Sequence, residues 1–584
     1  MPKSTLVDEN VRVPMRDAAH IVMDVHRPAS PGRHPAILMR SYGRRFGNRN
    51  PLLIRDLVDA GYAYVNSEVR GRGGSDGEWH PERAASVEGV DGYDTIEWLA
   101  TQPWCDGNVG MIGASHMAAM QYFAAFEHPP HLRAIAPWTG GGPGSGGSGF
   151  RPARSGGVMS LITTLVWMPN EGPGVLDNLE RQGNDVSQAR ALLARVRRDP
   201  TELYEHLPLL DHPLGGAGRL GELFRWRVQT PNLVDERAPR DWSRIELPCL
   251  HECGWYDAVN WAEFENFGGL RSAAGTPEAR AGQHIVCGPW QHGMQFQSTL
   301  GDLHFGENAT NEGSGLHALQ IAFFDRYVRG NPNIRLPRVR YFVMGANEWR
   351  EADDWPPPAA ARHKLYLHSG GNANSAAGGG ALGWTPPEAE LSDAFVYDPH
   401  RPVPTVGGAM IGAVTGPGVL VGPIEQARVE RRHDVLCYTS EPMSADVEIS
   451  GPLEVHLWVS TSAVDTDFTA KLTHVYPDGQ SYNLAEGILR LSGRHLDGQQ
   501  AAVAPGEVYA IVITLGHTSL LLRAGFRLRL QVSSSSFPQY DRNMNTGHPI
   551  GTDASGIRAL QTVYHDTQHP SFIAIPVVGD QSDT

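Results

Sequence analysis

Three residues in the first half of the chain have the types and the order of a nucleophile, an acid and a base. The first is Ser115, where the apolar run Val109–Ile112 leads into Gly-Ala-Ser. A strand that turns sharply at Gly-x-Ser before a helix leaves the serine hydroxyl exposed at the top of a sheet, as in a nucleophile elbow. Met117 stands where the second glycine of Gly-x-Ser-x-Gly usually lies, so the motif is partial. Because Gly-x-Ser is also common in ordinary turns, the rest of the chain must decide its meaning.

The other two residues, Asp257 and His292, each follow an apolar segment that we expect to be a buried strand. Asp257 ends the segment 247–257, and His292 follows the segment 283–291. The order serine, aspartate, histidine is that of an α/β-hydrolase, and the carboxyl ends of parallel strands meet at one edge of the sheet. Taken singly, Asp257 could cap a loop, and His292 could be one of 25 histidines with a structural hydrogen bond. Order and context together favour a catalytic triad.

The chemistry of these three side chains explains why they would occur together. A serine hydroxyl is a weak nucleophile and needs an adjacent base. Neutral imidazole takes a proton near pH 7 and later returns it to the leaving group, while a buried carboxylate orients the imidazole and stabilises its cation. We therefore predict a serine esterase in which Ser115 forms a covalent acyl-enzyme, His292 is base and then acid, and Asp257 orients His292. This chemistry needs neither a metal nor an organic cofactor.

Several motifs, in one order along the chain, resemble a known family. Segments 107–115, 254–257 and 288–292 are similar to motifs of the cocaine esterase-like acyl esterases, which are relatives of the X-Pro dipeptidyl peptidases and the α-amino acid ester hydrolases. The similarity continues in segments 69–77, 104–107 and 537–547, and so covers nearly the whole chain. The resemblance implies an α/β-hydrolase catalytic domain with an inserted helical cap, followed by a C-terminal all-β jelly-roll sandwich.

The resemblance also implies an oxyanion hole. One donor is the backbone N–H of the residue after the nucleophile, His116, and the other is a tyrosine hydroxyl after an early strand. Here the apolar segment 34–40 leads to Tyr42, which takes that role. Each such donor typically contributes about 2.7–4 kcal/mol to catalysis. The alternative for Tyr42 is a half-buried packing residue.

Two departures from the family pattern bear on the substrate. His116 replaces the usual tyrosine, so its side chain could reshape the acyl pocket or add a second titrating group near Ser115. In the α-amino acid ester hydrolases an acidic pair closely follows the catalytic aspartate and binds the substrate ammonium. Here Asp257 is followed by Ala-Val-Asn-Trp, which argues against a free α-amino group on the acyl side.

Length and composition are those of a large soluble enzyme with several domains. At 584 residues the chain is too long for one core, and its net charge of −15 disfavours polyanionic partners. We see no basic stripe, so nucleic-acid binding is not expected. Residues 1–16 carry charges throughout, and no apolar run reaches the length of a membrane helix. We therefore expect a cytoplasmic protein with no membrane partner that acts on a small-molecule ester; its surfaces leave a homodimer open.

The five cysteines predict reduced, buried side chains rather than a disulfide framework. Cys249, Cys253 and Cys287 could be imagined as a metal site, but we expect them to pack in the core, with no metal bound.

We divide the chain into four segments. Residues 1–145 and 241–335 should form the two parts of the α/β-hydrolase domain. Residues 146–240 should form the helical cap, because helical patterns dominate there. Residues 336–584 should form the jelly-roll sandwich, because short alternating strands are separated by turn signals. Within the sandwich, segment 540–543 reads as a domain-contact loop rather than a sugar site.

Five large apolar residues are candidates for substrate binding. A mobile helical cap over Ser115 would exclude water and shape substrate choice. The alternative for the cap residues is that they form the core of the cap. The candidates are Met159, Leu165 and Trp167 in the cap, and Trp255 and Trp290 beside Asp257 and His292.

Other functions remain open at the level of sequence. Within the same family, an amidase or peptidase, such as an X-Pro dipeptidyl peptidase or a β-lactam acylase, or an acyl transferase, would use the same residues. The alternative outside the enzymes is a catalytically inactive carbohydrate-binding or scaffold protein. The presence of all three triad residues argues against it.

Overall fold

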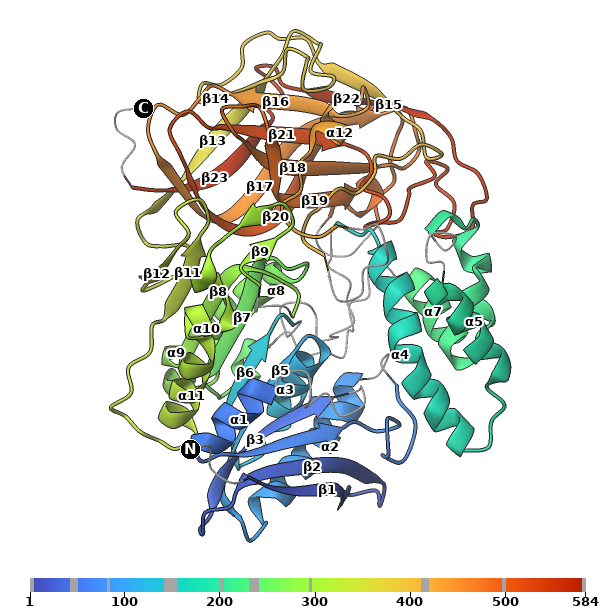
Figure 1. The fold of residues 1–584 in the computed structure, drawn as a ribbon. Helices are drawn as coiled ribbons and strands as arrows, with labels where there is room; N and C mark the ends of the chain where they lie inside the picture. The colour runs from blue at the N-terminus through green and yellow to red at the C-terminus, as the bar shows by residue number, and fades with distance from the viewer. Residues whose placement is uncertain are drawn as a thin grey trace.

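The molecule consists of an α/β domain, a lobe of helices beside it and an all-β domain above both (Figure 1). The computed structural model describes residues 5–41, 51–80, 84–140, 156–198, 204–229, 241–293, 297–410, 420–495 and 500–579. Within this part of the chain, no helix is long and apolar enough to cross a membrane.

The α/β domain is built on one mixed sheet, which has ten strands in the part that the structure describes. Its order is β1-β2-β4-β3-β5-β6-β7-β8-β11-β12, and the run from β4 to β11 is parallel. Central strands that are buried on both faces read as near-continuous apolar runs, which is why they could be found in the sequence. The strands are β1 (Thr5–Pro14), β2 (His20–Pro28), β3 (His34–Ser41), β4 (Ala63–Glu68), β5 (Cys105–Ala114), β6 (Leu132–Trp138), β7 (Cys249–Tyr256), β8 (Gln283–Gln291), β11 (Val339–Val343) and β12 (Glu348–Ala352).

Helices cover both faces of this sheet. Alternate strand residues separate into two buried clusters, with Leu38 and Met111 in one and Ile37 and Ile112 in the other. The first cluster packs against α2, α3 and α8, and the second against α1 and α11. This is the layering that right-handed crossovers between parallel strands produce. The helices are α1 (Pro51–Asp59), α2 (Ala84–Ala100), α3 (His116–Phe126), α8 (Asn260–Ala273), α9 (Pro277–Ala281), α10 (Asn311–Ser314) and α11 (Leu316–Tyr327).

The sheet extends further along the chain than predicted. Strand β11 pairs in parallel with β8, and β12 pairs with β11, so both belong to the α/β sheet. Both strands lie beyond residue 336, in the segment that we assigned to the sandwich, and they extend the α/β sheet. The alternating pattern of β11 would suit either sheet, and only its pairing with β8 decides between them.

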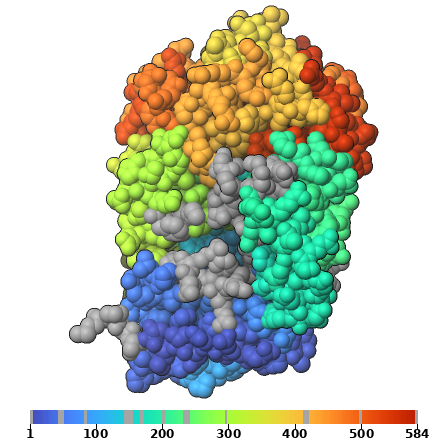
Figure 2. Space-filling view, turned by 45° about the vertical axis from the view of Figure 1, so that its right-hand side comes forward, coloured from blue at the N-terminus to red at the C-terminus, as the bar shows by residue number. Residues whose placement is uncertain are grey.

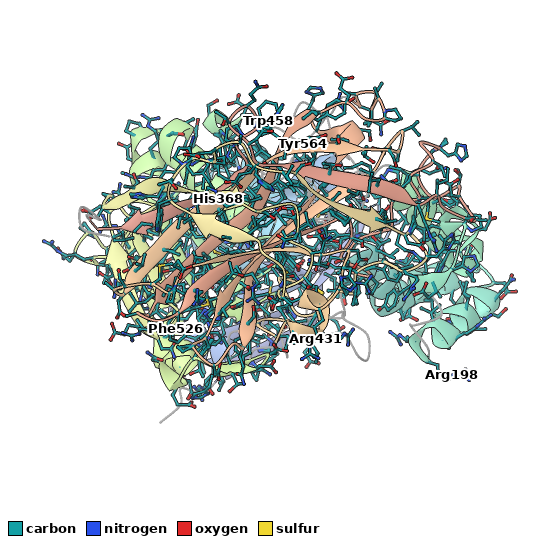
Figure 3. The ribbon with its side chains drawn as sticks, turned by 90° about the horizontal axis from the view of Figure 1, so that it is seen from above. Arg198, His368, Arg431, Trp458, Phe526 and Tyr564 are labelled. Carbon is teal, nitrogen blue, oxygen red and sulfur yellow. The ribbon has the colours of Figure 1, made fainter. Side chains whose placement is uncertain are left out.

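The helical lobe lies between β6 and β7 in the chain, within the segment predicted as the cap. It contains α4 (Leu161–Arg181), α5 (Ser187–Arg198) and α7 (Arg219–Gln229). One apolar cluster joins residues of these helices, such as Leu176 and Phe224, to Met120 and Phe123 of α3. Seen from above, Arg198 at the end of α5 lies at the periphery, so the lobe stands beside the body of the molecule (Figure 3).

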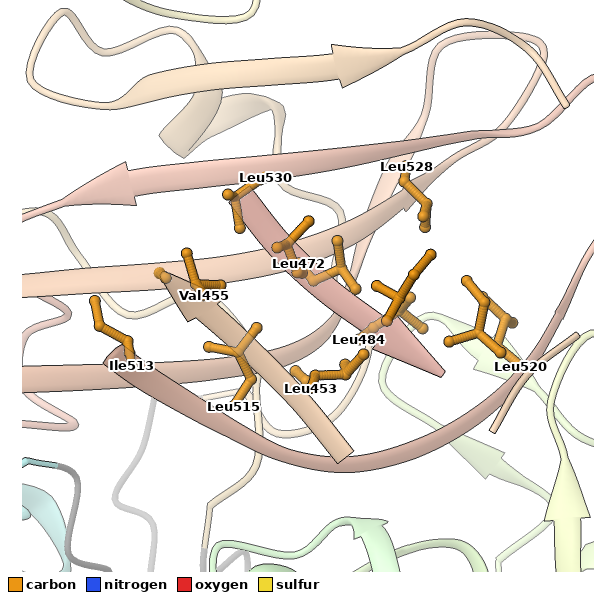
Figure 4. Packing of buried hydrophobic residues seen from close by; sticks show 14 of the residues in the cluster. Leu453, Val455, Leu472, Leu484, Ile513, Leu515, Leu520, Leu528 and Leu530 are labelled. Carbon is orange, nitrogen blue, oxygen red and sulfur yellow. The ribbon is translucent and has the colours of Figure 1, made fainter. Parts of the chain in front are cut away.

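The C-terminal domain is an all-β sandwich, as predicted. Its core is a layer of branched aliphatic side chains that includes Leu453, Leu472, Ile513, Leu520 and Leu530 (Figure 4). Burial of these apolar side chains removes their surface from water and so stabilises the sandwich. The strands are β13 (Ala360–His368), β14 (Ala381–Gly383), β15 (Asp393–Tyr397), β16 (Leu436–Ser440), β17 (Val447–Thr461), β18 (Asp467–Val475), β19 (Ser481–Arg490), β20 (Tyr509–Leu522), β21 (Arg527–Ser533), β22 (Ala559–Tyr564) and β23 (Phe572–Val578).

The loop after β21 joins the sandwich to the helical lobe, as predicted for segment 540–543. Tyr540 forms an isolated bridge with Ser160, just before α4. The carbonyl of Pro538 accepts the N–H of Ile162 at 3.0 Å. The guanidinium of Arg542 pairs with Glu205 of the lobe at 2.9 Å.

Candidate active site

Ser115 lies at a strained turn between β5 and α3. Its φ of 58° and ψ of −121° are rare for a residue other than glycine. The Ser115 N–H donates to the carbonyl of Trp138 on β6 at 2.9 Å, and the Ser115 carbonyl accepts the N–H of Ala118 at 3.0 Å. The side chain is half-buried. Strain of this kind persists only where the surroundings hold it, and it concentrates at functional sites.

Two glycines allow the chain to pack closely around this turn. A Cβ at Gly113 would lie 2.7 Å from the Cβ of Met117, so the missing side chain makes room for the methionine that replaces the usual second glycine. A Cβ at Gly140 would lie 2.2 Å from the Cβ of Ala118 and 2.9 Å from the Ser115 carbonyl oxygen. Residues after β6 therefore press directly on the turn.

Asp257 and His292 form a buried hydrogen-bonded pair. The Nδ1 atom of His292 lies 3.0 Å from Oδ1 and 3.2 Å from Oδ2 of Asp257. The Asp257 side chain is fully buried, and Oδ1 also accepts the N–H of Val259 at 3.0 Å. Because a carboxylate only accepts, the pair favours the tautomer with the proton on Nδ1, which leaves Nε2 as the basic atom.

All three predicted triad residues lie at one edge of the sheet. Strands β5, β6, β7 and β8 are neighbours and run parallel. Ser115, Asp257 and His292 follow the carboxyl ends of β5, β7 and β8, where open α/β sheets bind their ligands. The helical lobe, drawn in teal, lies directly beside the blue N-terminal part of the α/β domain on the molecular surface (Figure 2).

The His116 side chain is buried rather than open to solvent. Its ring meets the edge of Trp79 at a centroid distance of 6.5 Å. Burial, together with the positive charges of Arg72 and Arg40, holds the pKa of His116 well below its usual value. The lowered pKa keeps the imidazole neutral at neutral pH, which argues against a second titrating group near Ser115.

Of the two predicted oxyanion donors, the backbone N–H of His116 lies within the described residues and Tyr42 does not. His116 is the first residue of α3, and backbone N–H groups in the first turn of a helix have no acceptor within that helix. They also lie at the positive end of the helix dipole, which suits a developing oxyanion. Tyr42 lies outside the described residues, so its role stays a prediction.

The predicted pocket residues Trp255 and Trp290 lie in the interior. Nε1 of Trp255 donates to the carbonyl of Phe342 at 2.7 Å, and its indole stacks on Phe264. Nε1 of Trp290 donates to the carbonyl of Ala309 at 2.5 Å. Both indoles are at least 98% buried. Their placement favours core packing over contact with substrate.

Two of the three predicted cap residues are also buried in the interior. Met159 and Leu165 are buried in the cluster that the lobe shares with Met120 and Phe123. This favours the alternative stated for them, the core of the cap. Trp167 belongs to α4, but its side chain lies outside the described residues.

The cysteines are buried. Cys253 and Cys287 lie opposite each other on β7 and β8, and burial raises the pKa of both thiols. Among the described residues, no three histidine, cysteine or acidic side chains lie together as a metal-binding group.

A set of buried polar groups behind the serine was not predicted. Glu263 of α8 accepts the N–H of Gly140, the carbonyl of Glu252 accepts the N–H of Thr139, and His251 contacts Glu263. A histidine and a glutamate inside the apolar segment 247–257 were the available signal, since charged types in a buried strand need a partner. The partner of His251 is Glu263 of the next helix, and the partner of the Glu252 carbonyl is Thr139, so neither could be found from this segment alone.

The fold and this edge of the sheet are those of an α/β-hydrolase with a C-terminal sandwich, and comparisons with known proteins agree. Residues 17–294 match the model of the X-Pro dipeptidyl-peptidase (S15) family, and residues 332–574 match that of the X-Pro dipeptidyl-peptidase C-terminal non-catalytic domain. A cocaine esterase of Rhodococcus sp. is 34% identical over 98% of each chain. A putative serine esterase of Mycobacterium bovis is 26% identical over 97% of this chain and 94% of its own.

Solved structures are similar over nearly the whole chain. An α-amino acid ester hydrolase has a TM-score of 0.76 at 25% identity and covers 99% of this chain and 97% of its own. An aminopeptidase from a marine-sediment Thaumarchaeota archaeon has a TM-score of 0.80 at 24% identity, with the same coverage, and supports the fold. The chain belongs to the cocaine esterase-like acyl esterase family, its N-terminal half matches the S15 family model, and it is a serine hydrolase of carboxylic esters.

Proposed function

We propose that this esterase acts through a Ser115–His292–Asp257 triad and a covalent acyl-enzyme on a small-molecule ester. One observation carries the proposal: a strained, half-buried serine ends β5 at the sheet edge where a buried Asp257–His292 pair ends β7 and β8. A serine with a purely structural role does not require a backbone at positive φ. The buried Asp257 orients His292 toward the same edge of the sheet, as a base requires.

In the proposed mechanism His292 Nε2 takes the proton of the Ser115 hydroxyl as Oγ bonds to the ester carbonyl carbon. The carbonyl π electrons move to oxygen, and the N–H of His116 and the hydroxyl of Tyr42 stabilise the oxyanion. Asp257 stabilises the imidazolium, which then protonates the departing alkoxide as the ester C–O bond breaks. A water molecule, deprotonated by His292, repeats the sequence on the acyl-enzyme and releases the acid.

The surroundings of Asp257 support an acyl group without a free ammonium. No carboxylate occupies positions 258–261. Instead, the amide of Asn260 donates to the carbonyls of Trp255 and His517 at 3.2 Å each, so it is committed to the domain junction. A relative is named for cocaine, and we therefore include cocaine with p-nitrophenyl esters as a probe.

The test is labelling of the purified protein with a fluorophosphonate, followed by intact-mass measurement and peptide mapping. We expect a single adduct on Ser115, ester turnover by the wild type and loss of both in Ser115→Ala. Near-wild-type turnover by Ser115→Ala would reject Ser115 as nucleophile. Faster cleavage of an amide than of its matched ester would favour the peptidase reading, and folded protein without adduct or turnover would favour an inactive binding protein.

A further inference from the structure

A cluster of fully buried polar side chains lies behind the proposed nucleophile. Glu263 of α8 and His251 of β7 have no exposed side-chain surface, and Glu263 Oε2 lies 3.3 Å from His251 Nδ1. The same Nδ1 lies 3.2 Å from the hydroxyl of Tyr122 on α3. Buried charges are costly unless they are paired and hydrogen-bonded, so this cluster needs a reason to exist. The triad proposed above does not use it.

The protonation of His251 follows from its other neighbour. The amide nitrogen of Gln283 donates to the carbonyls of Leu247 and Ala279, so its oxygen faces His251 Nε2 at 3.1 Å and accepts from it. With Nε2 as a donor to Gln283, Nδ1 faces both Glu263 Oε2 and the Tyr122 hydroxyl. Burial raises the pKa of Glu263, and the contact with His251 opposes that rise.

The second carboxylate oxygen of Glu263 points away from His251 and binds the turn after β6. Oε1 accepts the N–H of Gly140 at 2.9 Å. The preceding residue, Thr139, has a φ of 45°, which is a genuine outlier for a β-branched residue. Its N–H donates to the carbonyl of Glu252 at 2.7 Å. Strain of about 1–3 kcal/mol survives only when neighbouring contacts hold it, and these two hydrogen bonds flank the strained residue.

This turn forms one wall of the serine elbow. Trp138, just before it, accepts the N–H of Ser115 at 2.9 Å. Gly140 lies so close that a Cβ would come within 2.9 Å of the Ser115 carbonyl oxygen. A displacement of residues 139–140 must therefore displace Ser115 or open a gap beside it.

We propose that Glu263 is a positioning residue for ester hydrolysis: its buried carboxylate, held by His251, fixes the strained Thr139–Gly140 turn that sets the position of Ser115. This inference rests on the proposed role of Ser115 as nucleophile. Hydrogen bonds to a carboxylate are about twice as strong as neutral ones, which suits a group that must hold a strained backbone. A misplacement of about 1 Å at a reacting atom can cost about 100-fold in rate.

The test compares Glu263→Met, which keeps the length of the side chain but removes the acceptor, with Glu263→Gln, which keeps an acceptor for Gly140. Removing one partner of a buried pair typically costs about 3–5 kcal/mol, so Glu263→Met should have a lower thermal midpoint than Glu263→Gln, which keeps a polar partner for His251. The matched control is Glu265→Met, the same change at an exposed position of the same helix. For each protein, kcat and KM on a p-nitrophenyl ester, the rate of fluorophosphonate labelling and the thermal midpoint are measured.

We expect Glu263→Met to lose about 10- to 100-fold in both kcat and labelling rate at unchanged KM, because the serine and not the substrate is misplaced. The kcat and labelling rate of Glu263→Gln should lie within about threefold of the wild-type values, and those of Glu265→Met should equal them. A folded Glu263→Met with wild-type rates, or a Glu263→Gln as slow as Glu263→Met, would overturn the inference.

If Glu263→Met does not fold, Gly140→Ala decides the question. The added Cβ meets Ala118 directly, and the same loss of kcat at unchanged KM is expected, while wild-type rates would overturn the inference. Gly268→Ala is its control, because a Cβ there meets nothing within 4 Å. Ser115→Ala separates the two proposals. If Ser115→Ala still turns over the ester, Ser115 is not the nucleophile and the proposed function fails. If Ser115→Ala is inactive and Glu263→Met has wild-type rates, only the positioning role of Glu263 is rejected.

Discussion

Asp541 and Met159 are joined by a reciprocal pair of hydrogen bonds between the sandwich and the start of the helical lobe. The Asp541 N–H donates to the Met159 carbonyl at 3.0 Å, and the Met159 N–H donates to Oδ1 of Asp541 at 3.0 Å. The other carboxylate oxygen lies 3.3 Å from Nη2 of Arg490, which also pairs with Asp467. The C-terminal domain thus holds the segment from which α4 departs.

We predict that Asp541→Ala loosens the helical lobe. The variant leaves the buried N–H of Met159 without its acceptor, which typically costs about 1–3 kcal/mol, while Arg490 keeps Asp467. Limited proteolysis should therefore cut the lobe faster than in the wild type, and KM should rise more than kcat falls. Glu388→Ala, an exposed change in the same domain, is the control. Equal cleavage rates in Asp541→Ala and the wild type would contradict this tether.

A second prediction concerns the tautomer of His292. Asp257→Asn keeps the size of the side chain but allows its amide to donate to Nδ1, which moves the proton to Nε2 and removes the base. We expect kcat to fall by about 10⁴-fold with the fold retained, by analogy with triads in which this change has been made. Ester turnover and circular dichroism measure the two effects. A loss of less than about tenfold would mean that Asp257 does not orient the base.

The strand-end positions of Ser115, Asp257 and His292 could be predicted because their strands are buried on both faces and read as apolar runs. What could not be predicted depends on pairing between distant segments. Strand β11 joins β8 rather than the sandwich, although its own pattern suits both. The Glu263–Gly140 contact likewise joins residues that share no local pattern.

The direction of an aromatic side chain was also beyond the sequence. Trp255 and Trp290 stand next to the predicted acid and base, which suggested a pocket. The pairing of β7 with β8 shifts register between Gly254 and Tyr256, and a one-residue shift reverses which face a side chain meets. In the structure both indoles are buried.

Replacing Trp290 tests this placement. In Trp290→Phe the ring stays apolar, but the hydrogen bond to the Ala309 carbonyl and part of the packing against Trp349 are lost. We expect a lower thermal midpoint, from a loss of about 1–3 kcal/mol, with an unchanged ranking of kcat/KM across a panel of esters. A changed ranking of kcat/KM across the esters, with an unchanged thermal midpoint, would indicate that Trp290 contacts the substrate.

Buried neutral histidines should make the sandwich sensitive to acid. Burial lowers the pKa of His474 to about 4, whereas the unfolded chain has the ordinary value near 6.5. Between these values the unfolded state binds the extra proton, so the stability of the wild type falls as the pH falls, by about 1.4 kcal/mol per pH unit for this group. His474→Phe removes that contribution and should be less acid-sensitive in urea unfolding followed from pH 7 to pH 4. Parallel pH profiles of the two proteins would contradict the prediction.

His565 should act in the opposite sense. Its Nε2 lies 2.8 Å from Asp393 and its Nδ1 lies 3.2 Å from Glu390, with Tyr438 and His368 as further neighbours of these two carboxylates. Hydrogen bonding to Asp393 and the two negative charges outweigh burial and raise the pKa of His565.

A group whose pKa is raised in the folded state contributes stability that is complete below its ordinary pKa, near 6.5, and is lost as the pH rises through the folded value. We therefore expect His565→Gln to lower the free energy of unfolding more at pH 6 than at pH 9, since the amide cannot carry the charge that the two carboxylates stabilise. Urea unfolding of both proteins at the two pH values measures the difference. An equal loss at pH 6 and pH 9 would mean that His565 is neutral in the folded protein and serves only as a hydrogen-bond donor.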